Sequence, residues 1–182
     1  MHWVLDVVRR LRRRRRITRA ALEAELTASP AKQELLIRAL DAARTASAEE
    51  KRRAIAASIT AGMESDVDAA RENDVLRLIA ELDLAHVLAL QIMSQPRTLM
   101  TNAAFLGQTN FEMMDLGEID GRLSGLEERV MAVLVSRGLV AEDRSMTFKS
   151  AMDSYRITNY GRMILARFTD PEPESEEYLS EA

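Results

Sequence analysis

Residues 124–168 read SGLEERVMAVLVSRGLVAEDRSMTFKSAMDSYRITNYGRMILARF. Ser124, followed three residues later by Glu127, has the spacing of a capping box, in which each side chain accepts a hydrogen bond from the other residue's backbone amide. A helix is therefore predicted to begin here and to end at Gly138. Its apolar residues, at helical spacing and expected to share one face, are Leu126, Val130, Val133 and Leu134.

The rest of this stretch predicts two short strands and a closing helix. One strand opens at Leu139 and Val140, a polar wing loop covers 142–154, the returning strand alternates over 155–157, and Thr158 caps the last helix. A short helix at 116–122, capped by Asp115 or Glu118, would precede the turn at Ser124 and Gly125. Helix, turn, helix and a two-stranded wing together indicate a winged helix-turn-helix.

The motifs GLV at 138–140 and YRITNYGRMIL at 155–165 resemble the close of MarR-type and related winged-helix domains. In those domains GLI, a wing and the pattern Y-x-L-T-x-x-G recur. The resemblance covers about a quarter of the chain and implies a winged-helix fold. It implies less about function, because many winged helices bind DNA while others only hold proteins together.

Composition predicts that the remainder is helical. The chain has 182 residues, of which 47% are hydrophobic, and its 7 glycines and 4 prolines leave little room for long loops. We therefore expect a mainly α protein, with an N-terminal helical region and a C-terminal winged helix carrying a two-stranded β-wing. The expected divisions are a basic amphipathic helix at 1–16, a helical region at 17–95, a connecting arm at 96–114, the winged helix at 115–168 and an acidic disordered tail at 169–182.

Start signals divide the helical region into successive helices. The predicted caps are Thr18, Ser29 before Pro30, Ser47 in a capping box with Glu50, Ser65 in one with Asp68, and Asp83, while Pro96 stops the last helix. The helix that ends near Thr45 is expected to bury Leu36, Leu40 and Ala43.

The layout of this region carries a second resemblance. EEKRRAIAASITAGM at 49–63 and NDVLRLIAELDLAHVLAL at 73–90, followed by the distant winged end, resemble the bacterial abortive-infection alpha proteins. The resemblance lies in layout rather than in signature residues. It implies a phage-defence or mobile-element setting and no catalytic residues.

Charge is distributed unevenly along the chain, although the net charge is only -4. Residues 1–20 hold eight arginines against one acid, whereas residues 170–182 hold six acids and no base. A basic amphipathic helix suits phosphate contacts on nucleic acid, an anionic membrane surface or an acidic protein partner. It is equally consistent with a helix whose valines pack inward and whose arginines are solvated.

The residues that enzymes and metal sites require are scarce. The chain has no cysteine and only two histidines, and His86 lies between leucines at helical spacing, which favours a structural role over a ligand role. The sequence contains no nucleophile elbow, phosphate-binding loop or dinucleotide fingerprint. We therefore expect no enzyme activity, cofactor, metal or small-molecule substrate. Without a membrane-spanning run or a signal sequence, the expected location is cytoplasmic.

Two functions remain open, and the sequence slightly favours the first. The first is nucleic-acid binding by a homodimer through sequence-tolerant phosphate contacts. The expected contact residues are Arg9, Arg10, Arg12, Arg13, Arg14, Arg15 and Arg16 in the N-terminal arm and Arg144, Lys149 and Arg156 in the wing. Because the helix after Ser124 begins with Glu127 and Glu128, base reading by that helix is expected to be weak or absent.

The second function is that of a protein-interaction or membrane-docking scaffold, with the winged domain as a dimerisation module. It accounts for the two glutamates and for the apolar residues of the connecting arm. In a further variant the acidic tail competes with nucleic acid for the basic arm.

Overall fold

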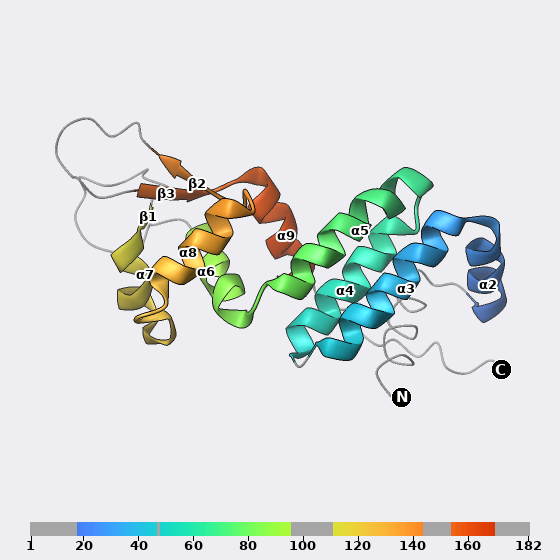
Figure 1. Ribbon diagram of the computed structural model, residues 1–182, viewed down its shortest axis with the longest axis horizontal. Helices are drawn as coiled ribbons and strands as arrows, with labels where there is room; N and C mark the ends of the chain where they lie inside the picture. Colours follow the sequence, from blue (N-terminus) through green and yellow to red (C-terminus); the bar gives the residue numbers. More distant parts are fainter. Residues whose placement is uncertain (1–17, 47, 96–110, 144–153, 170–182) are drawn as a thin grey trace. The chain divides into compact units, whose positions relative to one another are not determined.

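The computed structural model describes residues 18–46, 48–95, 111–143 and 154–169 and contains two compact units (Figure 1). The first unit comprises the chain up to Glu81 together with the residues from Arg167 onward, and the second comprises Leu82–Ala166. The fold class predicted from the sequence is confirmed, because the described residues are mainly helical with a small antiparallel sheet near the C-terminal end. The predicted basic helix at 1–16 and the tail from residue 170 lie outside the described residues.

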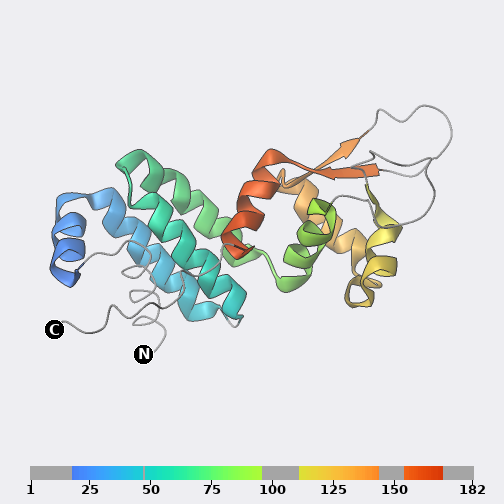
Figure 2. The same ribbon diagram turned by 180° about the vertical axis from the view of Figure 1, so that it is seen from behind.

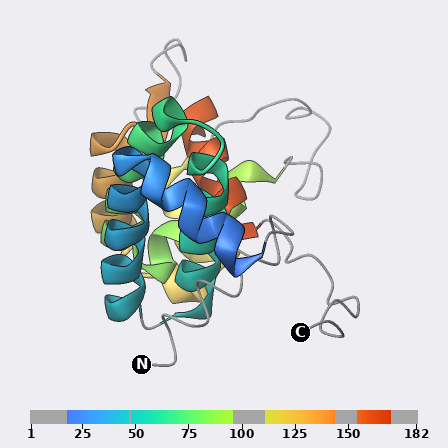
Figure 3. The same ribbon diagram turned by 90° about the vertical axis from the view of Figure 1, so that its right-hand side faces the viewer.

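The first unit is built on three long helices packed side by side (Figure 1, Figure 3). They are α3 (Pro30–Thr45), α4 (Glu49–Gly62) and α5 (Asp66–Glu81), and the shorter α2 (Arg19–Ala28) precedes them. The short connections make α4 antiparallel to both neighbours, and α4 packs against α3 and α5 alike. The largest side chains buried in this unit are Leu35, Ile55, Ile59, Met63, Leu76 and Ile79.

The buried face of α3 is rotated about the helix axis relative to the face that the sequence predicted. Leu35, Ala39 and Ala43 are fully buried, whereas Leu36 and Leu40 are only half-buried. The prediction was right for Ala43 and wrong for the two leucines. Small alanines occupy the inward face because α3 lies close to both α4 and α5, and the leucines lie at the margin of that contact.

Most of the predicted helix starts are confirmed. Thr18, Ser29 and Ser65 accept hydrogen bonds from the backbone amides three residues ahead, at 3.1 to 3.2 Å. The start of α4 is different, because its N-cap is Ala48 and no side chain caps it, while Ser47 lies outside the described residues. Glu49 and Glu50 instead place negative charge in the first turn, where the helix dipole favours it.

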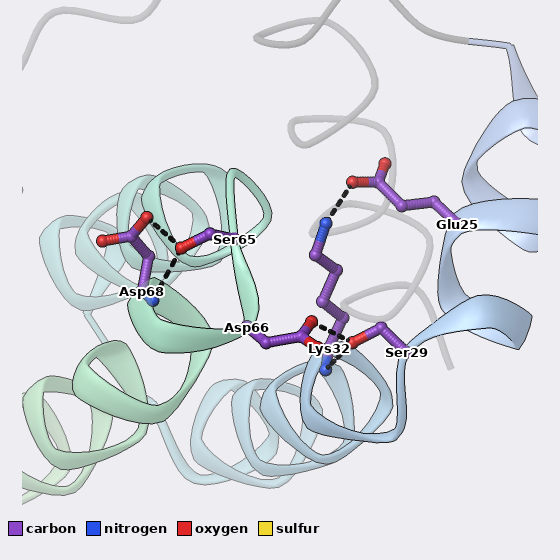
Figure 4. A network of polar contacts seen from close by, with 6 residues as sticks. All are labelled: Glu25, Ser29, Lys32, Ser65, Asp66 and Asp68. Carbon is purple, nitrogen blue, oxygen red and sulfur yellow. Dashed lines mark hydrogen bonds and ion pairs between the residues drawn. The ribbon is translucent and has the colours of Figure 1, made fainter.

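Polar side chains join the parallel N-termini of α3 and α5 (Figure 4). The Ser29 hydroxyl caps α3 and donates a hydrogen bond to Asp66 Oδ1 at 2.5 Å, and the Ser65 hydroxyl donates to Asp68 Oδ2 at 2.6 Å. Lys32, nearly buried, donates through Nζ to Glu25 Oε1 of α2 at 2.7 Å. Two parallel helix dipoles repel each other, and these carboxylates offset the positive ends. The carboxylates of Asp66 and Asp68 therefore lie at the helix N-termini, where the positive ends of the dipoles would otherwise attract anions.

We expect Ser29→Ala to lower the free energy of unfolding by about 1–2 kcal/mol, because it removes the cap of α3 and the hydrogen bond to Asp66 together. Urea denaturation followed by circular dichroism measures the change. Ser94→Ala, at the exposed end of α6 (Leu84–Ser94), is the control and should change stability by less than about 0.5 kcal/mol. Equal effects of the two substitutions would contradict a stabilising role for this junction.

The second unit has the element order of a winged helix. Its elements are α6, β1 (Phe111–Glu112), α7 (Met113–Ile119), a 3-10 turn η2 (Gly121–Leu123), α8 (Glu127–Ser136), β2 (Val140–Asp143), β3 (Ser154–Ile157) and most of α9 (Asn159–Thr169) (Figure 1, Figure 2). The residues of α9 from Arg167 onward belong to the first unit. The sheet order is β1-β3-β2, with both pairs antiparallel, and Val140 faces Ile157 while Phe111 faces Tyr155. β2 and β3 are the predicted wing strands, and α8 occupies the position of the second helix of a helix-turn-helix.

Two parts of this unit differ from the sequence prediction. The contact boundary lies between Glu81 and Leu82, so α6 packs with α7, α8 and β3 instead of ending the first helical region at residue 95. β1 and the start of α7 lie within the predicted connecting arm 96–114, whose residues 96–110 are outside the described part. A two-residue strand carries no alternation that a sequence reading can detect.

Close packing at Gly161 ties the end of α8 to β2 and α9. The Thr158 hydroxyl accepts a hydrogen bond from the Gly161 amide at 2.9 Å and donates to the Gly138 carbonyl at 2.8 Å. A Cβ on Gly161 would collide with the backbone carbonyl of Leu139. Gly138 itself has a φ of 68°, a conformation that favours glycine and lets the chain turn from α8 into the strand.

We expect Gly161→Ala to destabilise the protein by about 1–2 kcal/mol. The new Cβ would clash with the Leu139 carbonyl, and this cost outweighs the better helix propensity of alanine. Thermal unfolding followed by circular dichroism measures this. Gly121→Ala is a matched control, because a Cβ there would meet nothing within 4 Å. An unchanged stability of Gly161→Ala would contradict this prediction, because it would show that the surrounding backbone accommodates the added Cβ.

Candidate interaction surface on the winged-helix unit

Helix α8 is fixed in place by one apolar face. Val130, Met131 and Leu134 are buried at 3%, 2% and 0% exposure, and the helix packs against α6, α7 and β2. Val133 and Val135 are half-buried at the margins of this face. The opposite side of α8 is consequently held toward solvent in a fixed orientation.

The turn before α8 does not use the predicted capping box. Gly125 has a φ of 77°, the N-cap is Leu126, and no side chain caps the helix. α8 therefore begins at Glu127, and Ser124 ends the η2 turn instead. Leu126, which the sequence analysis placed on the apolar face of this helix, is 40% exposed because it precedes the first helical turn.

Glu127 and Glu128, both in the first turn of α8, have different surroundings. Glu127 is half-buried, and its carboxylate lies against Gly117 of α7, where any side chain larger than hydrogen would collide with it. Glu128 is exposed. Both carboxylates suit the positive end of the helix dipole, but only Glu128 is exposed to solvent.

The outward face of α8 is defined here as Glu128, Arg129, Ala132 and Ser136, all of which are exposed. These residues recur every three or four positions and so share one side of the helix. The face presents one carboxylate and one guanidinium in its first turn. The small side chains of Ala132 and Ser136 follow further along the helix. It has no asparagine, glutamine or lysine, and its single arginine lies beside a carboxylate.

Of the predicted nucleic-acid contacts, the structure describes one. Arg156 is exposed on β3 between the buried Tyr155 and Ile157, so strand alternation directs it away from the core. Arg144 and Lys149 of the wing lie outside the described residues, as do the arm residues at 9–16. The predicted site as a whole therefore stays a prediction from the sequence.

The second unit is acidic over its described ranges. Residues 82–95, 111–143 and 154–166 contain nine aspartates and glutamates against five arginines. The arginines are Arg122, Arg129, Arg137, Arg156 and Arg162. Of these, Arg122 is held by Asp120, with Nη2 at 2.6 Å from Oδ2. Over the whole of residues 82–166 the sequence has ten acids against eight bases, so the negative excess of this stretch is small.

Asp120 and Arg122 form a local unit that the sequence reading missed. The Asp120 carboxylate accepts hydrogen bonds from the Arg122 side chain and from its backbone amide, which makes Asp120 the N-cap of η2. These bonds lower the pKa of Asp120 to about 2, the side-chain bond being the larger cause. The sequence Asp-Gly-Arg is the only signal, and it is too short to distinguish from a solvated turn.

His86 has the structural role that its spacing favours. It is 5% exposed, and its Nδ1 accepts a hydrogen bond from the backbone amide of Asp83 at 3.1 Å. Asp83 in turn accepts from the amides of Ala85 and His86, which completes a capping box at the start of α6. Across the described ranges, no group of three or more metal-ligating side chains converges.

The comparisons with known proteins identify no relative. No family model, no curated protein and no solved structure matches the chain. The similarities to MarR-type domains and to abortive-infection alpha proteins therefore remain predictions from sequence. Within the part of the chain that the structure describes, no helix is long and apolar enough to cross a membrane.

We expect the Asp120 carboxyl to titrate near pH 2 in carboxyl-detected NMR and Arg122→Gln to raise its pKa toward the ordinary value of 3.8. Because the folded pKa lies below the unfolded one, the Asp120–Arg122 contribution to stability is fully present above about pH 4 and is lost as the pH falls toward 2. An ordinary pKa in the native protein would contradict the capping geometry.

Proposed function

We propose that this chain is a non-enzymatic binding protein whose winged-helix unit is a protein-interaction module. The observation that carries the proposal is the outward face of α8. It presents a carboxylate, a single arginine beside it and two small side chains, where a DNA-reading helix presents several hydrogen-bond donors to base edges. The rigid burial of the other face of α8 supports a preformed surface.

Electrostatics argues in the same direction. A base-reading helix enters a groove flanked by two phosphate backbones, with a negative charge every ~1.7 Å of helix axis. Glu128 stands at the N-terminal end of α8, which in such complexes lies deepest in the groove. The negative charge of Glu128 disfavours that approach and leaves a protein surface as the better partner.

Nucleic-acid binding through phosphates is the second candidate, and the arginine-rich arm favours it. Eight arginines lie within residues 1–20, and Arg156 is exposed on the wing strand. Such contacts would depend on salt and tolerate any base sequence, with α8 uninvolved. An anionic membrane surface or an acidic protein would attract the same arm. The abortive-infection resemblance makes phage defence the setting in which we would look first.

Photo-crosslinking tests the proposal. Ala132 is replaced by p-benzoylphenylalanine in the full chain, and cells producing the protein are irradiated. We expect covalent adducts that protease removes and nuclease leaves intact, because the outward face of α8 contacts protein. The same probe at Glu118, exposed on α7 but outside this face, is the control and should give far fewer adducts. Nuclease-sensitive adducts at Ala132 would overturn the proposal in favour of DNA or RNA reading by α8.

A further inference from the structure

We propose that the acidic tail, residues 170–182, docks on the outer face of α4 in the first unit. This outer face is defined here as Arg53, Ala57 and Thr60, which follow one another at helical spacing. The contact lies within the first unit and does not depend on the function proposed for α8.

Helix α4 has no exposed side, unlike the two helices that pack against it. α3 and α5 each keep a row of exposed residues away from the bundle, among them Ile37 and Asp41 on α3 and Ala70 and Asp74 on α5. In α4 every residue after Glu49 is buried or half-buried. A helix at the margin of a three-helix bundle would normally show a third row of exposed residues.

The buried outer face of α4 points away from both α3 and α5. Gly62 marks the inner side, because a Cβ there would meet Leu35 of α3 and Glu72 of α5. Ala57 lies about 140° around the helix from Gly62 and is nevertheless 3% exposed. The described elements that pack against α4 are α3 and α5. We therefore infer that a segment of the first unit outside the described ranges, either 1–17 or 170–182, covers Ala57.

The connections of the chain favour the tail over the N-terminal arm. Arg167 Nη2 lies 2.7 Å from Oε1 of Glu72, which is 1% exposed and packs next to Gly62 of α4. The tail therefore starts two residues beyond a contact at the α4–α5 pair. Residues 170–182 could span roughly 43 Å when extended, whereas the 14 residues of α4 span about 21 Å. The arm instead leads into α2, which packs against α3.

Charge favours the tail as well. Within the described residues, the Nε atoms of Arg52 and Arg53 are buried and have no hydrogen-bond partner, although Arg52 Nη1 lies 3.7 Å from Glu49. Covering an unpaired guanidinium is costly, and a carboxylate is its strongest acceptor. The tail has six acids and no base, so it can supply that acceptor. The arm would place further arginines beside these two and repel them.

Docking of the tail controls access to the arginines of α4. A nucleic acid or an acidic protein must displace residues 170–182 before it can reach Arg52 and Arg53. The tail is therefore an intrachain competitor for anions at α4, whatever the N-terminal arm binds.

The reactivity of a cysteine at the covered position tests the docking. The chain has no cysteine, so Ala57→Cys in the full chain provides its only thiol. We expect this thiol to react slowly with uncharged iodoacetamide, measured by mass spectrometry. Replacing Glu174, Glu176 and Glu177 by lysine should raise the rate about tenfold, which corresponds to a loss of about 1.4 kcal/mol of docking free energy.

Arg53→Glu gives the reciprocal test with the same reporter. With the natural tail it should raise the rate by a similar factor, because like charges then face each other. Combined with the lysine-substituted tail it should restore the slow reaction, since the charges are again opposite. A variant that has merely lost stability would not recover in this way.

Ala70→Cys, at an exposed position of α5, is the control and should react rapidly with either tail. Circular dichroism checks folding, and Thr60→Cys is the reporter if Ala57→Cys does not fold. A fast reaction with the natural tail, or a slow one that the lysine substitutions leave unchanged, would overturn the proposal. Protection that is lost only when the arginines at 12–16 are replaced by alanine would assign the cover to the arm instead. Protection that disappears on dilution would assign it to a second copy.

Discussion

The winged-helix unit depends on the burial of one side of α8. Val130, Met131 and Leu134 bind the helix to the unit's core, and Gly138, Thr158 and Gly161 fix the point where the chain leaves it. Nearly complete removal of three large side chains from water contributes several kcal/mol, at roughly 1.5–3 kcal/mol each. This stabilisation is what holds the opposite face in one orientation and makes it a surface with defined chemistry.

Several charged side chains of this protein interact with groups of their own chain. In the first unit, Asp66 and Asp68 lie at the joined N-termini of α3 and α5, and in the second, Asp120 holds Arg122. Glu127 lies against Gly117 and stabilises the start of α8. Glu128 and Arg129 on α8 and Arg156 on β3 are, by contrast, exposed. A count of charges along the sequence cannot make this distinction.

The fold was largely predictable from sequence because its signals are local. Helix caps at Thr18, Ser29, Ser65 and Asp83 each involve residues within one turn, and the strand, wing and strand pattern before Thr158 is continuous in the chain. The predictions were wrong where contacts with other elements or the local backbone conformation determine the structure. α6 belongs to the second unit because it packs with α7, α8 and β3. Ser124 does not cap α8, because the positive φ of Gly125 allows a turn between Ser124 and the helix.

The candidate surface was predictable only in part. The sequence places Glu127 and Glu128 at the start of a helix, but it does not show that one is tucked against α7 while the other faces solvent. The most direct test of the account is an NMR titration of the isotopically labelled full chain with a mixed-sequence DNA duplex. We expect the amide resonances of 128–136 to stay unchanged while the duplex is added. Shifts concentrated in α8 would show that this helix reads DNA and would contradict the account.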